Sequence, residues 1–323
     1  MTLDYIDLHC DTAYELFHRD EHLDRNTCAV SLDSASCYSH YAQFFAVWSN
    51  KRLDDEAAWR DFLAIADRFE DEVTRCSGVT LARTANELNA AWESGSTAAF
   101  LAVEDARLLN GQLDRLDTLA ERGVRYLTLG WSGKSCICAS HDVTPSEDTG
   151  LTDFGRAVLK RCFELGIIPD ISHASERTTD EVLTLAEAAG KPIIATHSNA
   201  YAVYPHTRNL RDDHAQRLFA LGGLVGINLC KHHLRDCSHT NATVDDILRH
   251  VDHWLSLGGE HHIAIGGDLD GAALPEGICG VSDVAKLADA MAAHGYGDEL
   301  IRQIFYKNAR NFIMKNLGGS PVR

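Results

Sequence analysis

The stretch Tyr5-Ile6-Asp7-Leu8-His9-Cys10-Asp11 is a short, mostly apolar run that ends on a histidine and an aspartate two residues apart. Side chains alternate along a β-strand, so residues i and i+2 point the same way. The His9 nitrogen and the Asp11 oxygen can thus converge on one ion, while Cys10 points into the wall. The run therefore predicts a strand that presents two metal-binding side chains at its C-terminal end.

Apolar runs of strand length recur along the rest of the chain. With residues 5–8 they number eight, the others being residues 43–48, 98–103, 126–129, 167–171, 193–195, 224–229 and 263–265. Several lack strict alternation, which is typical of strands buried on both faces. Helical patterns lie between them, at residues 54–74, 176–189, 244–255 (after the N-cap candidate Thr243) and 298–315.

The alternation of strands with helices indicates an α/β fold with a parallel sheet. Eight strands favour closure into a (β/α)₈ TIM barrel, with a doubly wound open sheet as the alternative. No Pro- or Ser-rich linker divides the chain, so residues 1–323 are expected to form a single domain. No GxGxxG or GxxxxGK(S/T) motif follows a strand, which argues against a dinucleotide site or a P-loop.

Five of the eight runs end on a side chain that can bind a metal or move a proton. These side chains are His9 with Asp11, Glu104, His173, His197 and Asp268. In a TIM barrel the chemistry lies at the C-terminal ends of the strands. One histidine after a strand is unremarkable among seventeen, whereas five suitable ends are hard to attribute to chance.

The ligand types favour zinc, with Mn²⁺, Fe²⁺ or Co²⁺ as alternatives. A tetrahedral site with an open position takes three protein ligands, and this set exceeds that number because it holds five: His9, Asp11, Glu104, His173 and His197. Two metals that share a carboxylate would use all five, and Glu104 is the natural bridge.

Composition excludes several classes of function. The chain has 30 Lys+Arg against 47 Asp+Glu, a net charge of −17, and no basic stripe, which argues against nucleic acid as a partner. No secretory signal or membrane-spanning run is present, so we expect a cytoplasmic protein that does not bind membranes. The ten cysteines form no CxxC pair and are expected to be reduced thiols.

The chain resembles the membrane (renal) dipeptidases and their bacterial relatives, which are metallopeptidases of the amidohydrolase superfamily. The resemblance covers essentially the whole chain. It rests on the order and spacing of the segments at residues 6–12, 43–45, 103–104, 123–129, 150–155, 170–173 (Asp-Ile-Ser-His), 196–200 (Thr-His-Ser-Asn-Ala), 208–213 (Arg-Asn-Leu-Arg-Asp-Asp) and 266–271 (Gly-Gly-Asp-Leu-Asp-Gly).

The resemblance implies a binuclear zinc site. By this analogy His9 and Asp11 bind one zinc ion, His173 and His197 bind the other, and Glu104 bridges them. It further implies that Arg208 holds the substrate carboxylate, which suits a guanidinium fork, and that Asp268 transfers the proton. The reaction would be hydrolysis of L-Xaa-L-Xaa dipeptides, and of L-Xaa-D-Xaa dipeptides, by a metal-bridging hydroxide. Relatives commonly form homodimers.

Two positions depart from the renal pattern, in which a histidine follows Leu-Thr-Leu-Thr and helps to polarise the scissile carbonyl. Trp131 stands there in this chain and is expected to contact the substrate, and His141 further along the loop is the candidate replacement for the catalytic histidine. Cys230 stands where relatives usually carry a tyrosine that lines the substrate pocket. These departures leave substrate preference open. The same ligands also suit a lactonase, a deaminase, a cyclic-amide hydrolase or a non-catalytic metal-binding paralogue.

Overall fold

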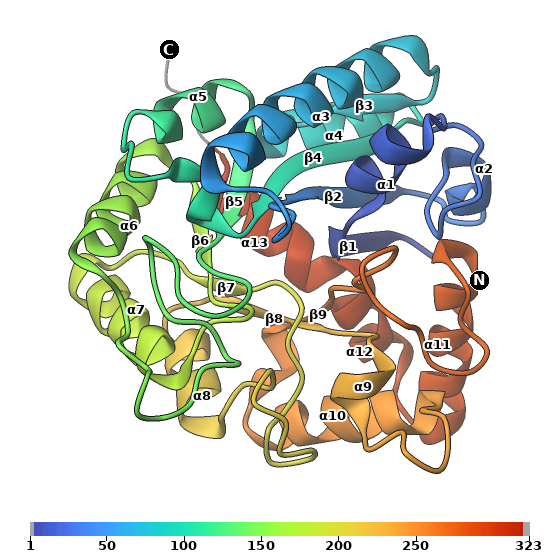
Figure 1. Cartoon of the computed structure of the whole chain (residues 1–323). Helices are drawn as coiled ribbons and strands as arrows, with labels where there is room; N and C mark the ends of the chain where they lie inside the picture. Colours follow the sequence, from blue (N-terminus) through green and yellow to red (C-terminus); the bar gives the residue numbers. More distant parts are fainter. Residues whose placement is uncertain (1–2, 319–323) are drawn as a thin grey trace.

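Eight parallel strands close into a barrel in the computed structural model, which describes residues 3–318 (Figure 1). Around the barrel the order is β2-β1-β9-β8-β7-β6-β5-β4, and pairing of β2 with β4 closes it. The predicted (β/α)₈ fold is confirmed. The barrel strands are β1 (Tyr5–Cys10), β2 (Tyr41–Trp48), β4 (Thr97–Glu104), β5 (Val124–Thr128), β6 (Ile168–Asp170), β7 (Ile194–Ala195), β8 (Leu224–Ile227) and β9 (Ile263–Ile265).

A further short strand, β3 (Val79–Leu81), was not predicted. It pairs with Thr97–Ala99 at the start of β4, whereas β5 pairs with β4 from Leu101 onward. Three residues, of which only the first is fully buried, carry too little apolar pattern to be recognised in the sequence. Because β3 lies at the N-terminal end of β4, it is remote from the strand ends where chemistry is expected.

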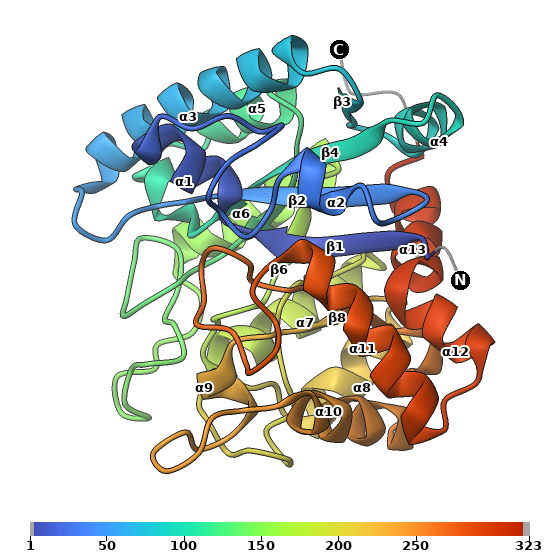
Figure 2. The same cartoon turned by 90° about the vertical axis from the view of Figure 1, so that its right-hand side faces the viewer.

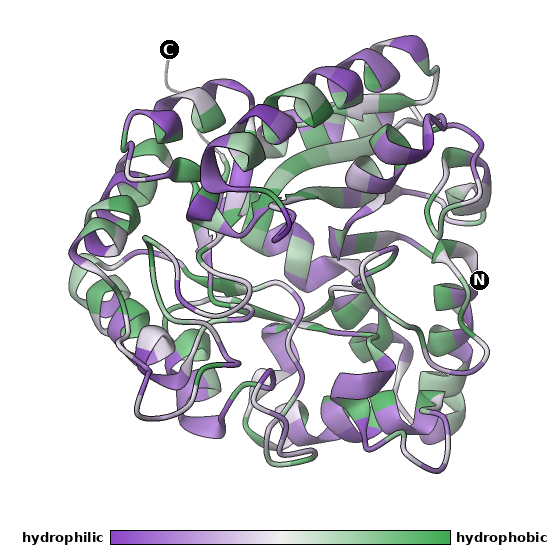
Figure 3. Cartoon of the chain, viewed as in Figure 1, coloured by the Kyte–Doolittle hydropathy of each residue, from purple (hydrophilic) through white to green (hydrophobic). Residues whose placement is uncertain are grey.

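The strands are apolar on both faces because each face meets a different layer. In β2 and β4, residues such as Phe44 and Phe100 fill the barrel interior, where their rings stack 4.5 Å apart. The alternate residues, such as Phe45 and Leu101, pack in the layer between strands and helices. Figure 3 shows the apolar colouring of β2 and β4 beside helices whose outer turns are polar. This two-sided burial explains the missing alternation in the sequence.

The helices form a ring around the barrel (Figures 1 and 2). They are α1 (Thr12–Arg19), α2 (Leu32–Ala35), α3 (Asp55–Arg75), α4 (Ala85–Glu93), α5 (Arg115–Glu121), α6 (Asp153–Leu165), α7 (Glu176–Ala189), α8 (Asp212–Ala220), α9 (Lys231–Leu234), α10 (Val244–Ser256), α11 (Val281–His294), α12 (Asp298–Arg302) and α13 (Asn308–Asn316), with short 3₁₀ turns at Ala106–Leu109 and Gly259–His261. The helices predicted at residues 54–74, 176–189 and 244–255 correspond to α3, α7 and α10.

The C-terminal helix closes the N-terminal end of the barrel. The sequence predicts one helix at residues 298–315, whereas the structure has α12, a π-helical turn at Gln303–Lys307, and α13. Ala309, Phe312 and Ile313 of α13 belong to the same apolar cluster as the barrel interior. Helix α13 therefore covers this end of the barrel, opposite the end at which the strands finish.

No helix within residues 3–318 is long and apolar enough to cross a membrane. All ten cysteines lie in this part of the chain, and no two of them form a disulfide there.

Two glycines allow the strands near the open end to approach closely. A Cβ atom at Gly226 of β8 would lie 1.8 Å from the carbonyl oxygen of Thr196, and one at Gly266 would lie 1.7 Å from it. Thr196 directly precedes His197, so this backbone contact sets how far that histidine stands from its neighbours.

Gly226→Ala should destabilise the protein by roughly 3 kcal/mol, because a methyl group would overlap a backbone oxygen that cannot move aside cheaply. Urea denaturation measures the free energy of unfolding. Gly297→Ala is the matched control, since a Cβ atom there meets nothing within 4 Å. Equal stability of the two variants would refute the close contact.

Candidate active site

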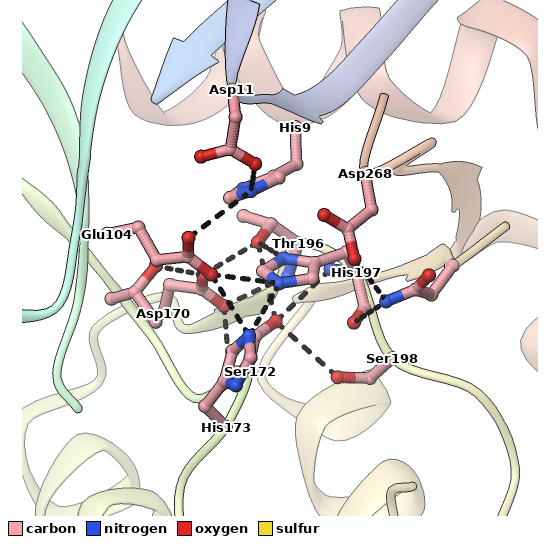
Figure 4. Close-up of polar contacts among 12 residues, drawn as sticks. His9, Asp11, Glu104, Asp170, Ser172, His173, Thr196, His197, Ser198 and Asp268 are labelled. Carbon is pink, nitrogen blue, oxygen red and sulfur yellow. Dashed lines mark hydrogen bonds and ion pairs between the residues drawn. The ribbon is translucent and has the colours of Figure 1, made fainter. Parts of the chain in front are cut away.

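The five predicted metal ligands converge at the open end of the barrel (Figure 4). The Nε2 atom of His9 lies 3.4 Å from Oδ2 of Asp11 and 3.8 Å from Oε2 of Glu104. The other Glu104 oxygen, Oε1, lies 3.0 Å from Nε2 of His173 and 3.3 Å from Nε2 of His197. Glu104 thus presents one oxygen to each of two ligand groups, which is the geometry of a bridging carboxylate.

A strand irregularity directs His9 into this cluster. Asp7 pairs with Gln43 of β2, and Cys10 pairs with Phe45, so β1 holds one residue more than β2 over this interval. Such a bulge changes where a side chain points. Regular alternation would place His9 on the same face as Asp7, and the extra residue is what permits both His9 and Asp11 to reach the mouth. Cys10 packs in the outer apolar layer, as predicted.

The donor atoms fit a metal. Ligands on one tetrahedral zinc ion, with bonds near 2.0–2.1 Å, stand about 3.3 Å apart, and the separations in this cluster run from 3.0 to 3.8 Å. His9 Nε2 and Asp11 Oδ1 are buried and have no hydrogen-bond partner among residues 3–318. Orphaned buried polar atoms of this kind are expected where an ion completes the site.

The pKa values of the clustered side chains are also consistent with a metal site. Burial raises the pKa of Glu104 well above its usual range, and burial lowers the pKa of His173 and His197 well below theirs. Burial alone would also lower the pKa of His9, but the neighbouring Glu104 and Asp11 raise it to about 10. Carboxylates and imidazoles held this close, away from water, are the groups that a divalent cation stabilises.

Asp170 of β6 organises two of the histidines. Its Oδ1 accepts hydrogen bonds from the backbone N–H groups of Ser172 and Thr196, both at 2.9 Å. Its Oδ2 accepts from the hydroxyls of Thr128 and Thr196, both at 2.6 Å. One fully buried carboxylate therefore ties the ends of β5, β6 and β7 together.

The same network assigns the tautomer of His197. The hydroxyl of Thr196 has one hydrogen, which it donates to Asp170, so it must accept from Nδ1 of His197, 2.7 Å away. The Nδ1 atom then carries the proton, and Nε2 keeps a lone pair directed at Glu104. Hydrogen bonds that fix a ligand histidine in this way are usual in metal sites.

Asp7 has the corresponding role for β1 and β9. Its Oδ1 accepts from the backbone N–H of His9 at 3.0 Å and from that of Gly267 at 2.9 Å, and its Oδ2 accepts from the Tyr5 hydroxyl at 2.5 Å. Burial raises the pKa of Asp7 despite these bonds. The Asp7 carboxylate therefore links the end of β1, which carries His9, to the loop after β9, which carries Asp268.

Asp268 follows β9 and faces the cluster. It adopts a left-handed backbone conformation with φ of 54°, and its Oδ2 accepts from Nδ2 of Asn228 at 3.1 Å. Its carboxylate can meet His9 and His197 around a common point. Burial raises the pKa of Asp268 to about 6.

Arg208 is a buried cation beside the cluster. It is 3% exposed and donates to the carbonyl of His197 at 2.8 Å and to Ser198 Oγ at 3.1 Å. Its Nε has no partner, and no carboxylate in the described part of the chain forms an ion pair with it. An unpaired buried charge is costly, so the guanidinium is poised for an anionic ligand.

A pocket of about 510 Å³ opens above the cluster. Of the residues predicted to contact substrate, Trp131, His141 and Cys230 line it, with Asp11, Glu104, His173 and Asp268 at its base. Arg208 does not line this pocket but a small adjoining cavity, shared with His173 and Ser198. Burial and the nearby Arg208 lower the pKa of His141 to about 4, and its Nδ1 lies 3.2 Å from Thr207 Oγ1.

Comparison with known proteins identifies the family. Residues 2–315 match the family described as membrane dipeptidase, peptidase family M19. The chain belongs to the membrane dipeptidase family. It is 34% identical over 231 residues to an uncharacterized dipeptidase of Schizosaccharomyces pombe, a match that covers 71% of this chain and about half (52%) of the yeast protein.

Two solved structures have the same fold throughout. A metallopeptidase of family M19 described as dipeptidase AC is 28% identical, with a TM-score of 0.91, and the match covers 99% of this chain and 100% of the other. A metallopeptidase from Rhodobacter sphaeroides, liganded with a phosphinate mimic of L-Ala-D-Ala, is 27% identical, with a TM-score of 0.90, covering 98% and 100%.

The side chains that orient the candidate ligands of this dipeptidase-family site were not predicted from the sequence. Asp7 and Asp170 interrupt apolar strands two residues before His9 and Ser172, and a carboxylate inside a strand was a usable signal. Tyr126, whose hydroxyl lies 2.8 Å from Nδ1 of His9, and Asn228 gave none, because their partners are far away in the sequence.

Asp170→Asn should weaken metal binding by about 10- to 100-fold and lower the free energy of unfolding by about 2–3 kcal/mol. An amide cannot accept all four hydrogen bonds, so Thr196 would lose the acceptor that sets the His197 tautomer. Competition with a chelator measures the affinity, and urea denaturation the stability. Asp33→Asn, at an exposed carboxylate paired with Arg25, is the control. A variant with native affinity and stability would contradict the role of Asp170.

Proposed function

We propose that this chain is a zinc-dependent dipeptidase whose two ions are bridged by Glu104. His9 and Asp11 would complete one ion, and His173 and His197 the other. Membership of the membrane dipeptidase family and the donor set of three imidazoles with two carboxylates support zinc. The observation that carries the substrate class is the buried, unpaired guanidinium of Arg208 beside this cluster.

Arg208 would hold the C-terminal carboxylate of the dipeptide. Two of its N–H groups are fixed by the His197 carbonyl and Ser198, which orients the fork, and Nε remains to be satisfied. A charge-assisted bond to a carboxylate is stronger than a neutral one and selects for geometry. Because this anchor stands next to a metal-ligand histidine, the bond cleaved would be the peptide bond nearest to the free carboxylate, which restricts substrates to short peptides.

The proton transfers would fall to Asp268. When bound, the ions lower the pKa of a water molecule and polarise the scissile carbonyl. Asp268, oriented by Asn228 and directed at the cluster, would take the proton from the attacking water and pass it to the leaving amine. His141 lies in the same pocket, and with Nδ1 beside Thr207 its Nε2 is left to hydrogen-bond the developing oxyanion.

A dipeptide screen tests the proposal directly. The purified protein should contain two zinc ions per chain by elemental analysis and should hydrolyse L-Xaa-L-Xaa or L-Xaa-D-Xaa dipeptides. The second series is included because the Rhodobacter sphaeroides protein was solved with a mimic of L-Ala-D-Ala. C-terminal amides of the best substrates should be cleaved at least ~100-fold less efficiently, since they lack the charge that Arg208 would bind. Bound zinc with no cleavage of any dipeptide would sink the proposal.

Asp268→Asn should retain zinc and fold normally but lose at least about 10²-fold in kcat, the usual contribution of a positioned acid–base group. Asparagine tolerates the left-handed backbone conformation of residue 268, so strain should not obscure the result. Steady-state kinetics with the best dipeptide gives kcat, and elemental analysis gives the zinc content. Near-normal turnover would remove Asp268 from the mechanism.

A further inference from the structure

Three aromatic rings line one end of the pocket. The ring of Trp48 lies between the other two: its centroid is 5.0 Å from the centroid of Trp131 and 5.5 Å from that of Tyr14. All three line the pocket and are only partly buried, so each has ring surface available to a ligand. Tyr14 is held in place because its hydroxyl accepts a hydrogen bond from Asn50 at 2.6 Å. We refer to Tyr14, Trp48 and Trp131 as the aromatic wall.

The aromatic wall is rigidly tied to the metal-ligand end of the barrel. Trp48 ends β2, and the next residue, Ser49, donates its backbone N–H to the carbonyl of Glu104 at 2.9 Å and its hydroxyl to the carbonyl of Asp105 at 2.7 Å. Trp131 also packs beside His173, with ring centroids 5.9 Å apart. The wall therefore has a fixed position relative to the bond that would be cleaved.

Topology places the aromatic wall opposite the carboxylate anchor. In the closed order of eight strands, β2 and β7 are separated by three strands on either side (Figure 1). Trp48 ends β2, while Arg208 is bonded to the carbonyl of His197, the second residue after β7. A dipeptide with its carboxylate at Arg208 and its peptide bond over Glu104 must therefore extend its N-terminal residue across the mouth toward Trp48.

Three carboxylates near the aromatic wall, those of Glu15, Asp142 and Asp270, already have hydrogen-bond or ion-pair partners. Glu15 pairs with Arg19 at 2.7 Å. Asp142 accepts from Ser132 and from the backbone of Gly133, and Asp270 accepts from Thr12 and from the backbone of Ala29, all at 2.6 Å.

A cation also already occupies one ring of the wall. The Lys51 ammonium lies over Trp131, 5.2 Å from the ring centroid. A basic side chain on the substrate would meet this like charge and would find no uncommitted carboxylate among the described residues beside the aromatic wall, whereas a neutral ring or large aliphatic group would gain apolar contact.

We propose that the aromatic wall selects the N-terminal residue of the substrate, so that the enzyme favours dipeptides beginning with an aromatic or large aliphatic residue over those beginning with glycine, alanine or a basic residue. The inference rests on the proposed dipeptidase function. The pocket volume of about 510 Å³ lies within the range of about 300–1,000 Å³ that encloses molecules larger than a small dipeptide. Trp48 and Trp131 thus act as specificity determinants.

Matched dipeptides test the selection. L-Phe-L-Ala and L-Leu-L-Ala should exceed L-Ala-L-Ala in kcat/KM by about tenfold or more, the gain expected from burying a large apolar side chain. L-Arg-L-Ala should fall below L-Phe-L-Ala, and L-Ala-L-Phe should show no comparable advantage. Equal rates for L-Phe-L-Ala and L-Ala-L-Ala, or a preference for L-Arg-L-Ala, would overturn this inference and leave the dipeptidase proposal standing. Failure to cleave any dipeptide would overturn both.

Variants at Trp48 connect the preference to the aromatic wall. Trp48→Leu should lower the ratio of kcat/KM for L-Phe-L-Ala over L-Ala-L-Ala at least about fivefold, because stacking and ring contact are lost. Trp48→Phe, which keeps an aromatic ring, should restore most of the ratio. Trp92→Leu is the control, since Trp92 lies on α4 against His40 and outside the pocket, and should leave the ratio unchanged. An unchanged ratio in Trp48→Leu with a native thermal transition would overturn the assignment.

Discussion

Two buried carboxylates hold the open end of the barrel in its working shape. Asp7 joins β1 to the loop after β9 by accepting two backbone N–H groups, and Asp170 joins β6 to β7 in the same way and reaches β5 through the Thr128 hydroxyl. Strand ends in a barrel diverge and leave backbone donors unpaired, and buried donors without partners are expensive. Asp7 satisfies such donors with bonds that also position His9, and Asp170 does so through Ser172 and Thr196, which directly precede His173 and His197. The positions of the histidines therefore follow from how the backbone N–H groups at the strand ends are hydrogen-bonded.

Much of this molecule could be predicted from its sequence, because its strongest signals are local. Strand-terminal residues such as Glu104 and His197 could be identified without knowledge of tertiary contacts, since all parallel strands of a barrel deliver their C-terminal ends to one face. The (β/α)₈ fold followed from the same short runs. The five ligands and Asp268 lie together as this reasoning predicted, although their roles in binding and catalysis stay predictions.

What escaped prediction depends on partners that are distant in the sequence. The bulge that directs His9 inward exists only relative to β2, and Asp170 meets Thr128 across 42 residues. The aromatic wall is similar in part: Trp131 was predicted from its position in the loop after β5, whereas Trp48 at the end of β2 belongs to no motif, and its contact with Trp131 exists only in the fold. Strand β3 was not predicted because its three residues carry almost no apolar pattern. It forms by pairing with the first residues of β4, which β5 does not reach. Pairing across the barrel, rather than local propensity, creates all of these features.

Tyr126 marks the boundary between the part of the barrel that provides stability and the part that provides chemistry. Its ring packs in the interior apolar cluster beside Phe44, 5.6 Å between centroids, while its hydroxyl reaches Nδ1 of His9 at 2.8 Å. A ligand histidine that offers Nε2 to a metal carries its proton on Nδ1, so His9 would donate to the tyrosine oxygen. The orientation of His9 is then set by how tightly the ring below is packed. Core packing and the geometry of the candidate ligands are thus parts of one constraint, and a change in the apolar interior would reach the candidate metal centre through a single side chain.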